Sequence, residues 1–334
     1  MASLELASIS IRNYAFEIVN TEVKRRLLPL LTSAAKSIDG GLIDLQDVFR
    51  RFSFDNICKF SFGLDPGCLE SSLPISVFAE SFDLASKLSA ERAMATLPLV
   101  WKIKRFLNMG TEKHLREAIE VVGLLADEVI MQKRKLGRDT MASALTTFFW
   151  LLATHPKVVS RVREESDQVM ASNQELASYE QIREMHYLHA VVNESLRLYP
   201  PVQFDSKFAM EDDVLPDGTF VRKGTRVTYH PYAMGRMEGI WGTDCMEFRP
   251  ERWLENGTFC PISPFKCPVF QAGIRVCLGK EMSLVEMKIV ALAVLRKFDV
   301  KIAAPVAAPR FDPGLTAMLS GGLQAEIRER VIAE

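Results

Sequence analysis

The chain has 334 residues, enough to bury a large hydrophobic core in one large or two smaller domains. Its 41 basic and 42 acidic residues nearly balance, which argues against nucleic acid as the main partner. The six cysteines include no Cys-x-x-Cys pair, so the composition favours reduced thiols on the cytosolic side of a membrane over a disulfide framework.

Membrane and targeting segments are not expected in this chain. No apolar run reaches the roughly 20 residues that a spanning helix requires. The first residues begin an amphipathic helical pattern that contains Glu5 and Arg12, which is unlike a signal peptide. We therefore expect a chain that is soluble or at most peripheral to a membrane.

Helical periodicity dominates the sequence. The spacing of apolar residues predicts helices over residues 4–36, 43–61, 75–91, 111–135, 139–153, 156–171, 178–199 and 278–298. Between residues 200 and 277, prolines, glycines and short β-prone segments replace this pattern, and FVRKGTRVTYH predicts two strands around a Lys223-Gly224 turn. The sequence thus predicts a mainly α fold with a small β element and a long irregular segment that ends at Cys277.

The helix over 178–199 carries a candidate ion pair near its end. Glu194 and Arg197 lie three residues apart and share one helix face. Such a pair is commonly an exposed surface pair. Downstream, however, FRPERW supplies Arg252 within the irregular segment. A Glu194–Arg197–Arg252 network would pin that segment to the helix, and this is the interpretation that we test below.

The segment FQAGIRVCLG, residues 270–279, places Cys277 directly before the last predicted helix. Its sulfur could be a packed thiol, a nucleophile or a metal ligand. Gly273 and Gly279 allow something flat and wide to approach the backbone, and Arg275 supplies a fixed charge for a carboxylate. The N-terminus of the following helix favours a thiolate. A haem with Cys277 on its iron fits all of these features.

Together these segments resemble the cytochrome P-450 family of haem-thiolate monooxygenases. FQAGIRVCLG matches the cysteine-loop signature of the family at every defined position, and ESLR matches its Glu-x-x-Arg. PERW matches its Pro-Glu-Arg-Phe, with Trp253 in place of the phenylalanine. PPVQFDSKFAM and YAMGRMEGIWG resemble plant members that oxidise the ω end of fatty acids and of jasmonoyl-isoleucine. The resemblance covers essentially the whole chain.

The resemblance implies one haem domain with the cytochrome P-450 fold, mainly α with small β-sheets, over residues 1–334. It implies hydroxylation and further oxidation of the terminal carbon of a fatty acyl or jasmonoyl–amino acid substrate, a small hydrophobic carboxylate. It also implies electrons from NADPH through a cytochrome P-450 reductase, and a location at the cytosolic face of the endoplasmic reticulum membrane. No nucleic acid partner is implied.

The same resemblance assigns roles to individual residues. The thiolate of Cys277 would be the axial ligand of the haem iron, which favours cleavage of the O–O bond. The haem would contact Phe270, Gly273, Arg275, Cys277, Gly279 and Lys207. The substrate pocket above it would be lined by Val202, Gln203, Phe204, Leu315, Thr316 and Ala317.

The chain also departs from the family. The membrane anchor, the early helices and their Trp-x-x-x-Arg motif are missing, so we expect an N-terminally truncated and incomplete fold. KRKLGRDTMASAL joins two segments that the family separates by a helix and the front half of the central helix, so we expect an internal deletion near 135–137. A non-catalytic remnant that binds haem weakly or not at all is the alternative function.

Asp139 and Thr140 lie at this junction and have two interpretations. They match the acid–alcohol pair with which the family delivers protons from a long central helix. Alternatively, a Gly-Arg-Asp-Thr sequence before an apolar run is a good N-cap, and the two residues would then cap a shortened helix over 139–154.

Overall fold

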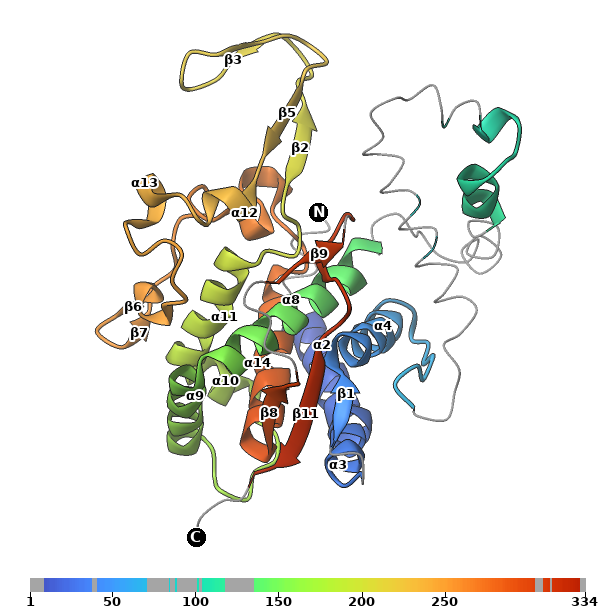
Figure 1. The fold of residues 1–334 in the computed structure, drawn as a ribbon. Helices are drawn as coiled ribbons and strands as arrows, with labels where there is room; N and C mark the ends of the chain where they lie inside the picture. The colour runs from blue at the N-terminus through green and yellow to red at the C-terminus, as the bar shows by residue number, and fades with distance from the viewer. Residues whose placement is uncertain are drawn as a thin grey trace.

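The computed structural model describes residues 9–37, 41–70, 84, 88, 101, 104–117, 135–303, 309–312 and 314–330. These residues form a mainly helical fold with small antiparallel sheets, which confirms the predicted fold class (Figure 1). Among the described residues, no helix has the length and apolar character needed to cross a bilayer.

The N-terminal helices follow the predicted pattern closely. Helix α2 (Ile9–Glu22) continues through a π-helical turn into α3 (Leu28–Ala35), as predicted for 4–36. Helix α4 spans Leu45–Phe62, and its predicted first residues instead form strand β1 (Leu42–Asp44). Asp44 decides this boundary, because its carboxylate accepts the amides of the first turn and caps the helix. The predicted helix over 75–91 and most of that over 111–135 lie outside the described residues.

Five further helices build the body of the domain: α8 (Lys135–Thr154), α9 (Pro156–Val169), α10 (Tyr179–Glu184), α11 (His186–Leu198) and α14 (Lys280–Lys297). The prediction of a single helix over 178–199 was wrong. Met185 has a non-helical backbone conformation, with φ −81° and ψ 81°, and separates α10 from α11. Helix α8 lies on α4, α11 and α14 (Figure 1). Phe148 and Phe149 of α8 are completely buried in this core, which holds the central helices together.

In the part of the chain that the structure describes, five small antiparallel sheets complete the fold. One has three strands, in which β11 (Gln324–Glu329) lies between β1 and β8 (Phe298–Ile302). Each of the others is one pair: β2 (Asp205–Phe208) with β5 (Arg226–Tyr229), β3 (Asp213–Val214) with β4 (Phe220–Val221), β6 (Leu254–Glu255) with β7 (Thr258–Phe259), and β9 (Phe311–Asp312) with β10 (Met318–Leu319).

The two strands predicted around the Lys223-Gly224 turn are present as β4 and β5, but they do not pair with each other. Ala209 explains this difference, since its backbone exchanges hydrogen bonds with Gly224 and Thr225 in the turn. The chain on the two sides of the turn therefore pairs with different strands. Figure 1 shows the resulting hairpins extending away from the helical body.

Between β5 and α14 the chain is irregular, as predicted. Besides the β6–β7 pair, it contains short helical turns: α12 (Pro231–Met234), α13 (Glu238–Trp241), η2 (Pro250–Trp253), η3 (Pro268–Phe270) and η4 (Gly273–Arg275). This segment lies along α11, which it contacts through η2, β6, β7 and α12 (Figure 1). The irregular segment ends where α14 begins. The path of this segment therefore determines the position of Cys277, which lies at its end.

One acidic side chain is buried between the helices. Glu286 of α14 is 4% exposed, and its carboxyl accepts a hydrogen bond of 3.4 Å from the side-chain amide of Asn56 in α4. Burial raises the pKa of Glu286 to about 8, and the Asn56 bond offsets this only in part. The folded protein therefore holds a proton on Glu286 at neutral pH.

We expect Glu286→Gln to change how stability depends on pH. An unfolded glutamate releases its proton near pH 4.3, whereas the folded protein keeps it to about pH 8, so this group lowers stability progressively between those values. Glutamine has no proton to lose. The variant should gain a few kcal/mol on the parent between pH 5 and pH 8, measured by urea unfolding at both values. Equal pH slopes for the two proteins would contradict a buried neutral Glu286.

Candidate active site

The cysteine loop, residues 270–279, is closed by its own backbone. The Cys277 amide donates to the Phe270 carbonyl at 2.8 Å, and the Val276 amide donates to the Gly273 carbonyl at 3.2 Å. Helix α14 begins at Lys280, directly after the loop. The Cys277 side chain is exposed, so its sulfur is available to a ligand.

The two glycines of the loop lie in different surroundings. A Cβ atom on Gly279 would lie 3.7 Å from the Ser283 hydroxyl and 3.9 Å from the Cys277 sulfur, both ordinary van der Waals contacts. A Cβ on Gly273 would meet no atom within 4 Å, but the residue has φ +66°. Its backbone conformation, and not the space beside it, is what favours glycine there.

The surface of the loop fits a flat apolar group that carries carboxylates. Ile274 is fully exposed at 100%, and Val276 and Leu278 are exposed at 40% and 48%. Arg275 is also exposed and forms no ion pair with a described residue. A single thiol, three exposed apolar side chains and a free guanidinium together match the chemistry of an iron porphyrin with its propionates.

Lys207, the other predicted propionate contact, lies on β2 opposite Val227 of β5. Its ammonium is 2.9 Å from a carboxylate oxygen of Asp205. Sequence reasoning missed Asp205, which also contacts Gln271 of the cysteine loop at 2.6 Å. Burial alone would raise the pKa of Asp205, but hydrogen bonds from Lys207 and Gln271 outweigh it and lower that pKa. No pattern in PPVQFDSK identified this contact in advance.

The structure brings the two predicted pocket segments together. The Ala317 amide donates to the Pro201 carbonyl at 2.8 Å, so the segment that begins at Val202 meets the segment that ends at Ala317. The Ser143 hydroxyl of α8 donates to the Ala317 carbonyl. Ala317 is buried, whereas Phe204 and Leu315 remain 38% and 49% exposed. Both segments are thus held against the central helix.

Asp139 and Thr140 lie inside α8, which spans Lys135–Thr154. The N-cap interpretation is therefore wrong, because helical geometry already exists four residues before Asp139. The helix is correspondingly longer than the predicted 139–154. Thr140 is one turn before Ser143, and residues three apart share a helix face. It therefore lies on the side of α8 that contacts Ala317.

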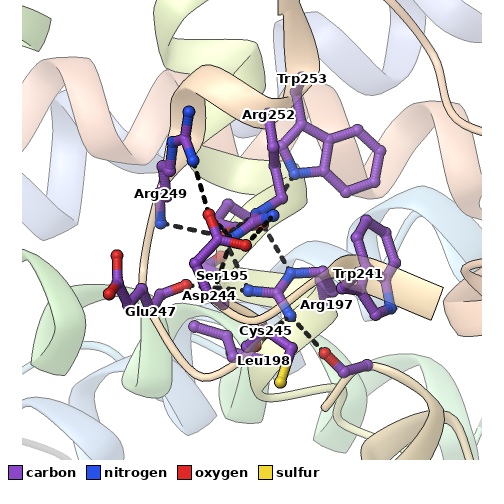
Figure 2. Close-up of polar contacts among 12 residues, drawn as sticks. Ser195, Arg197, Leu198, Trp241, Asp244, Cys245, Glu247, Arg249, Arg252 and Trp253 are labelled. Carbon is purple, nitrogen blue, oxygen red and sulfur yellow. Dashed lines mark hydrogen bonds and ion pairs between the residues drawn. The ribbon is translucent and has the colours of Figure 1, made fainter. Parts of the chain in front are cut away.

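The structure also brings Glu194, Arg197 and Arg252 together, as Figure 2 shows for the arginines and their surroundings. Glu194 and Arg197 are fully buried, so the pair is not a surface pair. The Glu194 carboxylate accepts from Arg197 Nε and Nη2 at 2.7 and 2.8 Å and from Arg252 Nε at 2.8 Å. This charge is therefore paired twice in the protein interior.

Further donors and acceptors of this network come from the irregular segment (Figure 2). The Trp253 indole donates to Glu194 at 2.9 Å, as does the Arg249 amide. Tryptophan in place of the family phenylalanine thus adds a hydrogen bond. The Arg197 guanidinium donates to the carbonyls of Gly235, Cys245 and Glu247, the latter two at 2.7 and 2.9 Å. Arg197 therefore fastens three points of the segment to α11.

A helical domain with an exposed cysteine at the head of a long helix, and a buried Glu–Arg–Arg network beneath it, has the features of a haem-thiolate protein. The family model for Cytochrome P-450 matches residues 137–325. The chain is 53% identical to cytochrome P-450 94C1 of Arabidopsis thaliana, over 99% of this chain and 74% of that protein. It is 42% identical to cytochrome P-450 94B3 of the same plant and to cytochrome P-450 94A1 of Vicia sativa, each over 99% of this chain and 72% of the relative.

The chain therefore belongs to the cytochrome P-450 family, as its motifs predicted. Members of this family are monooxygenases that bind haem through a cysteine thiolate. The enzyme class and the cofactor predicted from the sequence are thereby confirmed.

Proposed function

We propose that Cys277 is the axial ligand of the haem iron in this monooxygenase. The observation that carries the proposal is an exposed thiol, held by the closed loop at the head of α14, beside the exposed Arg275, which forms no ion pair with a described residue. Bound haem supplies the activation of O₂. Phe270, Gly273 and Gly279 would receive the ring, while Arg275 and Lys207 would bind its propionates. Lys207 would share its charge between a propionate and Asp205.

The proposed reaction is hydroxylation, and then further oxidation, of the terminal carbon of a fatty acyl or jasmonoyl–amino acid substrate. The resemblance of PPVQFDSKFAM and YAMGRMEGIWG to plant ω-oxidising enzymes supports this substrate class. Val202, Phe204 and Leu315 would bind the apolar tail and exclude water from the carbon to be oxidised. Gln203 and Thr316 supply polar groups, and Ala317 ties its segment to α8 by accepting the Ser143 hydroxyl. The substrate carboxylate would lie near the mouth of this pocket.

Proton delivery is assigned to Asp139 and Thr140 on α8. Their position one turn before Ser143, on the helix that holds Ala317, supports this role. The hydroxyl of Thr140 would hold a proton near the bound substrate, and the carboxyl of Asp139 would replenish it. Electrons would come from NADPH through a cytochrome P-450 reductase. The family would place the whole protein at the cytosolic face of the endoplasmic reticulum membrane.

The substrate proposal predicts the reaction products. With the family's central segment inserted between Lys135 and Gly137 and with reductase supplied, we expect terminal oxidation of jasmonoyl-isoleucine in preference to long-chain fatty acids. The physical reason is that a carboxylate head and a short apolar tail fit the segments at 202–204 and 315–317. Product analysis by mass spectrometry checks this, and hydroxylation only within the chain, or no turnover of either substrate, would contradict it.

A non-catalytic remnant is the second candidate function, and one observation favours it. The alignment with cytochrome P-450 94C1 runs over 369 positions, more than the 334 residues of this chain, so that relative contains internal residues that are missing here. The reduced, carbon-monoxide-bound spectrum of the purified chain separates the two candidates. A thiolate-type Soret band supports the monooxygenase, and absence of haem supports the remnant.

A further inference from the structure

Gln271, the second residue of the cysteine loop, has a backbone conformation that only glycine adopts easily. Its φ is 65° and its ψ is 177°. In this region the Cβ atom of an ordinary residue meets its own backbone, so the conformation costs free energy and persists only where its surroundings hold it. Gln271 follows Phe270, whose carbonyl accepts the Cys277 amide. A relaxed Gln271 would therefore disturb the closure of the loop.

The side chain of Gln271 is held by the β2–β5 hairpin. Its amide nitrogen donates to Asp205 Oδ2 at 2.6 Å. The Tyr229 hydroxyl lies within hydrogen-bond distance of both Asp205 Oδ2, at 3.0 Å, and Gln271 Oε1. Asp205 and Tyr229 are also direct neighbours across the two strands, so one rigid pair of residues presents both groups. These three side chains form a closed triangle, which we call the hairpin clamp.

Asp205 is the centre of the hairpin clamp because it accepts bonds on both oxygens. Oδ1 accepts the Ser206 amide at 2.7 Å, which fixes the carboxylate on the strand. Oδ2 accepts from Gln271, from Tyr229 and from the Lys207 ammonium at 2.9 Å. The Lys207 ammonium balances the negative charge of the Asp205 carboxylate. The Gln271 side-chain amide therefore donates to a carboxylate that is already part of an ion pair.

We propose that Asp205 is a positioning residue of the haem–thiolate site: through Gln271 and Tyr229 it holds the cysteine loop in the conformation that presents Cys277. Asp205 itself touches no reacting group. It acts by stabilising the strained backbone of Gln271 and thereby the Phe270–Cys277 hydrogen bond. This inference rests on the proposed role of Cys277 only for its consequence on haem, since the hydrogen bonds that close the loop join residues of the chain itself.

Hydrogen–deuterium exchange on the haem-free chain tests the proposal. In Asp205→Ala, the peptide that contains the Cys277 amide should exchange at least about tenfold faster than in the parent, because the loop opens more often. Tyr229→Phe removes one hydroxyl and should give a smaller increase. The first turn of α14, where the Ser283 amide donates to the Gly279 carbonyl, should be unchanged. Unchanged exchange at Cys277 in Asp205→Ala would overturn the proposal.

A rescue variant separates positioning from a general loss of structure. Glycine adopts φ 65° and ψ 177° without strain, so Gln271→Gly added to Asp205→Ala should restore most of the protection at Cys277. Asp213→Asn is the matched control, because Asp213 also lies on a hairpin strand, but its carboxylate accepts, from described residues, only the neighbouring Val214 amide. Failure of the rescue, or equal loosening by Asp213→Asn, would also overturn the proposal.

The consequence for haem is read from the same variants. After addition of haem, Asp205→Ala should show a smaller share of thiolate-type Soret absorption than the parent, and the double variant should recover it. If exchange behaves as expected but the spectrum does not respond, the hairpin clamp is correct and the assignment of Cys277 as ligand is wrong. The two failures are therefore distinguishable.

Discussion

Cys277→Ala is expected to abolish the thiolate-type Soret band of the reduced, carbon-monoxide-bound protein completely. The band requires a cysteine thiolate on iron, and alanine supplies no ligand. No neighbouring cysteine can substitute. Cys267 is the other cysteine close to the loop in sequence, and burial raises its pKa to about 12, so it remains a thiol at neutral pH. Cys58 is buried in α4, away from the loop in sequence and in the fold.

Cys260→Ala is the matched control, because Cys260 is also exposed and lies in the same irregular segment. Cys260→Ala should show the same thiolate-type Soret band as the parent protein, and so should Cys58→Ala. Circular dichroism of Cys277→Ala should also match the parent, since the side chain is exposed and supports no core packing. Retention of the band in Cys277→Ala, or its loss in Cys260→Ala, would contradict the assignment of Cys277 as the ligand.

Local patterns were enough to predict most of the helices. Apolar spacing gave α9 and α14 to within two residues. Helix α9 buries one face, with Val158, Val162 and Ser166, whereas α14 is buried on all sides from Glu286 to Leu295. The errors occur where tertiary contacts determine the secondary structure or the strand pairing. Strand β1 replaces the predicted start of a helix because β11 pairs with it. The strands around Gly224 separate because Ala209, outside the predicted hairpin, pairs with the turn. Such pairings depend on chain segments that local periodicity does not relate.

The contacts of the candidate site also divide into local ones, which the sequence predicts, and long-range ones, which it does not. The spacing of Glu194 and Arg197 fixes their contact within one helix, so the sequence predicted it. The carbonyls that Arg197 binds, the indole of Trp253 and the hairpin clamp all come from the irregular segment or from the β2–β5 hairpin. The path of a long loop decides which groups meet in these contacts. The loop has no sequence periodicity from which its path could be predicted. Motif comparison predicted the candidate site, and only the structure revealed the contacts that hold its segments in place.

Arg197→Ala is expected to cost roughly 3–5 kcal/mol of unfolding free energy, the range for breaking a buried ionic set. The substitution removes hydrogen bonds to both oxygens of Glu194 and to the carbonyls of Gly235, Cys245 and Glu247. Glu194 keeps Arg252 and Trp253, but the carbonyls are left buried without their donor. Because these carbonyls belong to the segment that leads to Cys277, the variant should also be recovered free of haem.

Arg249→Ala provides the comparison that identifies burial as the cause. The Arg249 side chain is 56% exposed and, among the residues that the structure describes, pairs only with Asp244. Its backbone amide, which the substitution retains, donates to Glu194. Removing it should cost at most about 1 kcal/mol, as for other exposed ion pairs. Urea unfolding of both variants measures the difference. If Arg197→Ala unfolds at the same urea concentration as the parent, or no earlier than Arg249→Ala, the buried network does not hold the irregular segment on α11.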